Sequence, residues 1–96
     1  MIEVRVFTHP VCTTCPTAIR LAQRLADENP DVRLRIVSLG SARGREEAKA
    51  AQVLSVPTVF VGSTRFVGVP PWDAMVEALA QARNHTTEPS LLDERG

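Results

Sequence analysis

The sequence predicts a small α/β domain with the element order β-α-β-α-β-β-α, in which a mixed four-stranded sheet is flanked by three helices. Three observations lead to this prediction. Apolar and polar residues alternate in two early segments, which is the spacing of strands. Apolar residues recur every three or four positions in other segments, as on one face of a helix. A Gly-Ser pair then joins two short strand-like runs, which is typical of a hairpin.

The first half of the chain predicts a strand–helix–strand unit. Residues 2–7 and 32–36 both alternate apolar with charged side chains and are predicted to be strands. Residues 16–28 between them have helical spacing. Pro16 suits the first turn of that helix, where backbone N–H groups lack helical partners. Such a unit forms a parallel strand pair through a right-handed crossover.

The second half predicts a weaker helix, a hairpin and a last helix. A loop from residue 40 leads to a helix over residues 45–53, which has little apolar face. Residues 58–61 and 64–67 form the antiparallel hairpin. The last helix opens at Pro70-Pro71, and its predicted apolar face consists of Trp72, Met75, Val76, Leu79 and Ala80.

Length and composition indicate one domain and exclude several function classes. Ninety-six residues, 44% hydrophobic and 23% charged, suffice for a single domain. Residues 1–83 are predicted to form it, and the polar residues 84–96 are predicted to form a flexible tail. Eleven basic residues balance eleven acidic ones. Because nucleic-acid-binding modules and polybasic membrane anchors need a basic face, we expect neither nucleic acid nor a membrane as a partner.

The expected location is the cytoplasm. The N-terminal residues lack the basic and apolar regions of a signal peptide. No apolar run approaches the ~18 residues that a membrane span requires.

The two cysteines, Cys12 and Cys15, stand between the first predicted strand and the first predicted helix. Disulfide-stapled secreted domains carry four or more dispersed cysteines, so this pair indicates redox chemistry. Cys12 is expected near the helix N-terminus, where free N–H groups and the helix dipole stabilise a thiolate and lower a thiol pKa from ~8.5 to ~3.5–7.5. Since the thiolate attacks disulfides, Cys12 is the predicted nucleophile, and the more buried Cys15 is the predicted resolving thiol.

Other interpretations of these residues stay open at this point. His9, three residues before Cys12, is a candidate partner for the thiolate or for its proton, or is simply solvated. A structural zinc site needs four ligands, and besides the cysteines the sequence offers only His9 and His85 as soft ligands. Because His85 lies in the predicted tail, no metal is expected, and no other bound cofactor is expected either. The alternatives to an enzyme are a metal-binding or metallochaperone module, a non-catalytic redox sensor, and two cysteines that are simply core residues.

The cysteine segment, residues 6–16, resembles the active-site segment of the thioredoxin superfamily. Ser55-Val56-Pro57-Thr58 resembles the cis-proline loop of that superfamily, and residues 65–70 resemble its last strand and the glycine before the final helix. The likeness covers about residues 1–83 and is greatest to the small glutaredoxin-like thioredoxins, or protein disulfide oxidoreductases, of archaea and some bacteria. It implies a thioredoxin-like fold and an enzyme that reduces or exchanges protein disulfides. Electrons would come from a separate reductase, by resemblance a flavoprotein, or from a low-molecular-weight thiol.

The resemblance also implies a substrate-binding role for Val56 and Pro57. Pro57 would follow a cis peptide bond and stand opposite the cysteines. Val56 would then offer free backbone groups to an extended substrate segment, which is recognition by strand addition.

Several positions differ from the patterns of the relatives. Thioredoxins proper carry Trp before the first cysteine, often Gly-Pro between the cysteines, and a buried Asp in the first strand. The residues here are, in that order, Val11, Thr13, Thr14 and Val6. Thr13 and Thr14 are expected to help cap the helix. Glutaredoxins bind glutathione partly through Gly-Gly followed by acidic residues, and residues 68–73 keep only half of that signature.

Overall fold

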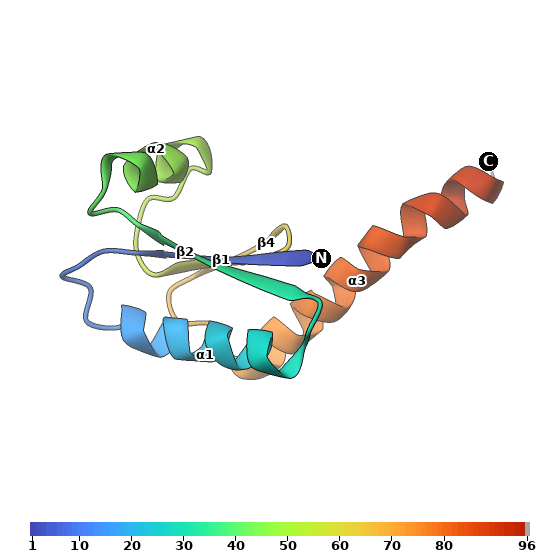
Figure 1. Cartoon of the computed structure of the whole chain (residues 1–96), viewed down its shortest axis with the longest axis horizontal. Coiled ribbons are helices and arrows are strands. Elements are labelled where there is room, and N and C mark those ends of the chain that lie inside the picture. The colour runs from blue at the N-terminus through green and yellow to red at the C-terminus, as the bar shows by residue number, and fades with distance from the viewer. Residues whose placement is uncertain (96) are drawn as a thin grey trace.

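The computed structural model describes the backbone of residues 1–95 and the side chains of residues 1–84. Its elements have the predicted order (Figure 1): β1 (Ile2–Thr8), α1 (Cys15–Glu28), β2 (Val32–Ser38), α2 (Ala42–Ala50), β3 (Thr58–Val61), β4 (Thr64–Val67) and α3 (Trp72–Arg95). The sheet has the strand order β2-β1-β3-β4. β1 pairs with β2 in parallel, whereas β3 is antiparallel to both β1 and β4. Within the described residues, no helix is long and apolar enough to cross a membrane.

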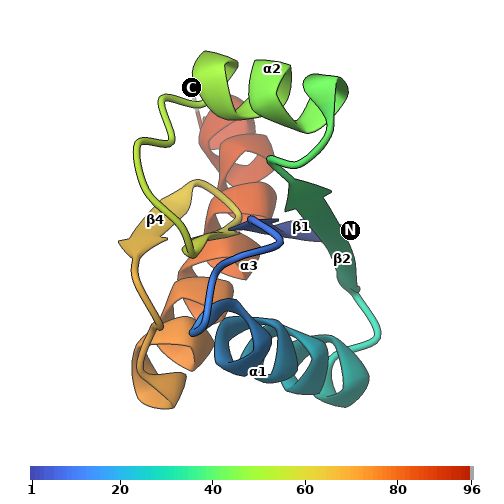
Figure 2. The same cartoon turned by 90° about the vertical axis from the view of Figure 1, so that its left-hand side faces the viewer.

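The sheet separates two apolar clusters. Figure 2 shows α2 on one side of the sheet and α1 on the other. The cluster on the α1 side joins the buried valines of β1 and β3 to buried residues of α1 and α3. The cluster on the α2 side joins Phe7, Val37 and Phe60 of three strands to Ala48 and Val53. Successive residues of a strand point to opposite faces, so Val6 and the adjacent Phe7 serve different clusters.

Helix α2 lies three residues earlier at both ends than the predicted range of 45–53. It starts early because the Ser41 side chain caps it by accepting a hydrogen bond from the backbone N–H of Gly44 at 3.0 Å. It ends early because Gln52 adopts a left-handed conformation with φ of 57°. The backbone N–H of Val53 then donates to the carbonyl of Ala48 at 2.8 Å, which closes the helix end.

The buried face of α3 differs from the predicted one. Met75 and Leu79 are buried as predicted, but Val76 is 43% exposed and Ala80 is also exposed. Ala78 is buried in their place. All these positions fit helical spacing, and the contact of α3 with α1 and the sheet selects among them.

Helix α3 also continues to Arg95, past the predicted end of the domain at residue 83. The side chains of residues 85–96 lie outside the described residues. The boundary at 83 and the flexibility of the tail stay predictions.

A charged network joins α2 to the first two strands. Glu47 of α2 accepts hydrogen bonds from Arg35 at 2.8 and 3.0 Å and from Arg5 at 3.1 Å. The hydrogen bonds from Arg35 are the main cause that lowers the pKa of Glu47 below its ordinary value of 4.5, although burial opposes the shift. The Glu47 side chain is 25% exposed, so solvent screens these interactions only in part.

We expect Glu47→Gln to lower the free energy of unfolding by about 1 kcal/mol at neutral pH. A carboxylate whose pKa is lowered by folding stabilises the protein above its unfolded pKa, and this contribution is lost as the pH falls through the folded pKa. The difference between wild type and Glu47→Gln in urea denaturation should therefore be present at neutral pH and shrink at pH values below 4.5. Glu46→Gln is the matched control, since Glu46 is exposed and no ion pair of the described residues involves it. A difference that persists undiminished in acid contradicts this account.

Candidate active site

The cysteines lie between the end of β1 and the start of α1. Cys12 belongs to the loop after β1, and Cys15 is the first residue of α1. They form a disulfide, with their Cα atoms 5.5 Å apart. Of the two cysteines, only Cys15 is helical. Cys15 is 3% exposed, whereas Cys12 is half-buried, so Cys12 is the more accessible sulfur.

His9 shapes the loop that carries Cys12. Its carbonyl accepts from the backbone N–H of Cys12 at 3.0 Å, and its Nδ1 accepts from the backbone N–H of Val11 at 3.3 Å. No hydrogen bond in residues 1–84 joins the ring to either sulfur, so a thiolate-partner role for His9 stays a prediction.

Thr14 occupies the N-cap position of α1 without capping it through its side chain. Its carbonyl accepts from the backbone N–H groups of Thr17 and Ala18, at 3.2 and 3.3 Å. The Thr14 hydroxyl Oγ1 lies 3.9 Å from Sγ of Cys12 instead. The expected side-chain cap is therefore wrong for Thr14, because its hydroxyl is directed to the sulfur. Pro16 stands in the first turn, as predicted.

The loop before β3 lies beside the cysteine loop. The register pairs Phe7 with Thr58, so the start of β3 is next to the end of β1 (Figure 2). The bond between Val56 and Pro57 is cis, as the resemblance implied. The Pro57 carbonyl accepts from the backbone N–H of Gly68 at 2.8 Å. The Thr58 hydroxyl donates to the Ser55 carbonyl at 2.7 Å, which holds the other side of the loop.

Val56 keeps its backbone groups available. In the described part of the chain, neither its N–H nor its carbonyl takes part in a hydrogen bond, and its side chain is half-buried. Free groups of this kind can pair with an extended segment of another chain.

Among the described residues, the buried core contains no carboxylate. Val6, at the position of the relatives' buried Asp, is completely buried among apolar side chains. Of the side chains described, the buried polar ones are those of Thr8 and Thr58. No three His, Cys, Asp or Glu side chains come together as a metal site there.

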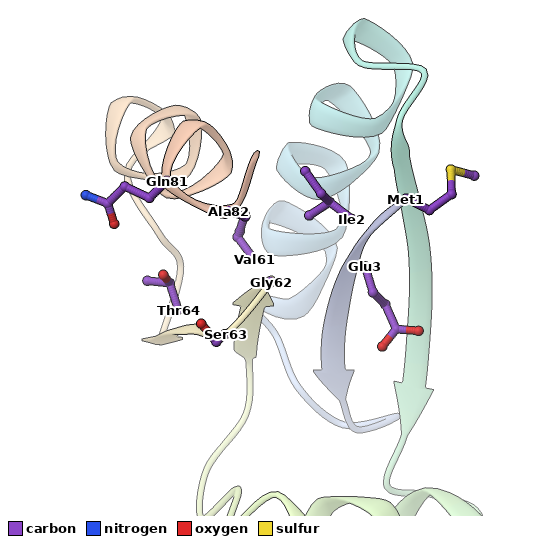
Figure 3. A pocket seen from close by; sticks show the side chains of 9 residues that line it. All are labelled: Met1, Ile2, Glu3, Val61, Gly62, Ser63, Thr64, Gln81 and Ala82. Atoms are coloured by element: carbon purple, nitrogen blue, oxygen red, sulfur yellow. The ribbon is translucent and has the colours of Figure 1, made fainter. Parts of the chain in front are cut away.

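A hollow at the opposite end of the sheet is separate from this site. Figure 3 shows it between the start of β1, the β3–β4 turn and α3. Gly62 and Ser63 of that turn line it together with Ile2 and Ala82. Because the cysteine loop leaves the far end of β1, this hollow does not adjoin the disulfide.

Comparison with known proteins finds thioredoxins among the relatives of this chain. The family model described as Thioredoxin domain matches residues 2–80. The thioredoxin of Methanocaldococcus jannaschii is 30% identical over 79 residues, which cover 81% of this chain and 92% of that protein. A probable thioredoxin of Methanothermobacter thermautotrophicus is 30% identical over 80 residues, 82% of this chain and 93% of that one.

The chain belongs to the thioredoxin family.

Solved thioredoxins share its fold. Oxidised mitochondrial thioredoxin 3 of Saccharomyces cerevisiae aligns with a TM-score of 0.71 and 20% identity, covering 83% of this chain and 77% of that one. Thioredoxin 1 of Thermosipho africanus aligns with a TM-score of 0.69 and 15% identity, covering 88% and 97%. The predicted thioredoxin-like fold is thus confirmed, as is the resemblance to archaeal thioredoxins.

Family membership and the Cys12–Cys15 pair together make this chain a thiol–disulfide oxidoreductase. Thioredoxins act on disulfide-containing proteins and draw electrons from a reductase. The sequence pattern located both cysteines and the cis-proline loop. It missed the contact of the Thr14 hydroxyl with Cys12, because only the folded loop brings these two side chains together.

Proposed function

We propose that Cys12 is the nucleophile and Cys15 the resolving thiol of a protein-disulfide reductase. The observation that carries this assignment is the difference in burial, since a substrate can reach the half-buried Cys12 but not Cys15, which is 3% exposed. In the reduced protein, the Cys12 thiolate attacks one sulfur of the substrate disulfide and expels the other as a thiolate. The Cys15 thiolate then attacks Cys12 Sγ in the mixed disulfide. This step releases the second substrate thiol and forms the Cys12–Cys15 disulfide, so two electrons pass to the substrate.

Val56 and Pro57 bind the substrate in this proposal. The free N–H and carbonyl of Val56 pair with the backbone on one side of the substrate cysteine, which is recognition tolerant of sequence. The hydrogen bonds on either side of Pro57 hold the loop in place, so that little ordering is needed when the substrate arrives.

The electron donor is a separate reductase or a low-molecular-weight thiol, and the protein works in the cytoplasm without a bound cofactor. The test of the function is catalysis of insulin reduction by dithiothreitol. We expect the protein to accelerate the precipitation of the reduced insulin B chain. A rate equal to that of dithiothreitol alone would contradict the proposed function. Cell fractionation tests the proposed location.

His9 is the candidate that assists the Cys12 thiolate. We expect His9→Ala to slow alkylation of Cys12 by iodoacetamide at neutral pH about threefold, because the loop that positions the sulfur loses the hydrogen bond from Val11 to Nδ1. The measurement is the alkylation rate of the reduced protein, followed by mass spectrometry. Thr17→Ala on the exposed first turn of α1 is the control. Equal rates in wild type and His9→Ala would leave His9 without a role at the sulfur.

A further inference from the structure

A groove of about 640 Å³ lies beside α2. Its apolar lining includes Leu39 after β2, and Val53 and Leu54 after α2. Val53 is buried and Leu39 is half-buried, whereas Leu54 is 96% exposed. Leu54 is thus an exposed apolar side chain beside two other apolar residues of the same groove.

Every charged side chain that lines the groove is basic: Arg45, Lys49 and Arg65. Arg65 is fixed in place, because it donates to the carbonyls of Ala51 and Gln52. The Arg45 side chain donates to the Leu39 carbonyl at 3.2 Å.

None of these three cations has a carboxylate partner in residues 1–84, although four other arginines there do. Lys49 stands in the last turn of α2, and its side chain takes part in no hydrogen bond or ion pair within the described residues. The groove therefore presents positive charge around an apolar lining, and nothing in the described part of the chain neutralises it.

The groove reaches the cysteine end of the sheet at two points. The backbone N–H of Leu39 donates at 2.8 Å to the carbonyl of Thr8, the last residue of the strand that leads to Cys12. Leu54 lies in the segment that leads directly to Val56 and Pro57. Leu54 and Val56 are two residues apart, so the groove adjoins the loop of the candidate site.

We propose that this groove binds an acidic segment of the protein substrate, in which an apolar side chain of leucine size is flanked by Asp or Glu. The apolar side chain covers Leu54 and contacts Val53, and its acidic neighbours pair with Lys49 and Arg45. This inference rests on the proposed reduction of protein disulfides and adds the class of substrate. Strand addition at Val56 tolerates many sequences, so the groove supplies the selectivity.

The experiment measures binding without redox chemistry. A short fluorescent peptide, free of cysteine, carries a leucine between glutamates, and a second peptide carries lysines in place of the glutamates. We expect the oxidised protein to bind the acidic peptide at least about tenfold more tightly at low salt. Lys49→Glu should weaken that binding about fivefold, which is the upper end of the worth of an exposed ion pair. Leu54→Ser should also weaken it.

Arg33→Glu is the matched control. It changes the net charge by the same amount, and Arg33 is an exposed residue of β2 that does not line the groove. Equal affinity for the two peptides, or an equal loss in Arg33→Glu and Lys49→Glu, overturns the proposal. Reduction of the uncharged 2-hydroxyethyl disulfide by the wild-type protein is measured in parallel. Its failure would refute the redox function, while the binding result still decides the groove.

Discussion

Replacement of Cys12 by serine is expected to reduce the catalysed rate of insulin reduction about a hundredfold or more, to that of dithiothreitol alone. A serine hydroxyl is not ionised at neutral pH and cannot form the mixed disulfide. The loss should not reflect unfolding, because Cys12 lies in a loop and is only half-buried. Circular dichroism of the variant checks this point. A Cys12→Ser protein that keeps its activity would show that the nucleophile lies elsewhere.

Cys15→Ser separates the two roles. Its Cys12 can still attack a substrate, but nothing resolves the product, so a covalent adduct with the substrate should accumulate. Mass spectrometry under non-reducing conditions measures this adduct. If Cys15→Ser turns over without an adduct and Cys12→Ser accumulates one, the two roles are reversed.

Replacement of Gly44 by alanine is expected to lower the free energy of unfolding by about 3 kcal/mol, the upper end of the usual cost of overpacking. Gly44 lies in the first turn of α2 and is buried. A Cβ atom added there would overlap the carbonyl oxygen of Ser38 and approach its carbonyl carbon to 2.7 Å. Both atoms belong to the backbone of β2, so no side-chain rotation relieves the overlap. Either α2 must move away from the sheet or its capped start must open.

Arg43→Ala is the control for this prediction, since Arg43 is the exposed neighbour in the same helical turn and should change stability by no more than about 0.5 kcal/mol. Urea denaturation of both variants gives the comparison. Because α2 packs on Phe7, next to the strand end that leads to Cys12, Gly44→Ala should also slow insulin reduction. A Gly44→Ala protein as stable as wild type would mean that α2 does not pack this closely on β2.

The local sequence pattern predicts the helix or strand to which a residue belongs better than it predicts which residues pack against it. Residues 2–7 and 32–36 are strands because their alternation allows little else, and the Gly62-Ser63 pair does join two antiparallel strands. The sequence pattern misses the start of α2, because it predicts a loop over residues 40–45. The serine that caps the helix and the glycine that lets it lie against β2 have meaning only once the sheet is present.

For the candidate site too, the sequence determines some features and the tertiary structure determines the others. By itself, the sequence determined the kind of chemistry, since two cysteines three positions apart between a strand and a helix form a redox pair, and a Val-Pro bond 41 positions after Cys15 matched the cis-proline loop. Only the tertiary structure decided which sulfur is accessible, where the Thr14 hydroxyl lies and which basic residues share a groove with Leu54. The physical reason is that periodicity and motifs act over one or two turns of chain. The burial of a side chain and the charges around it instead depend on contacts between segments that are distant in sequence, such as α2 and β4.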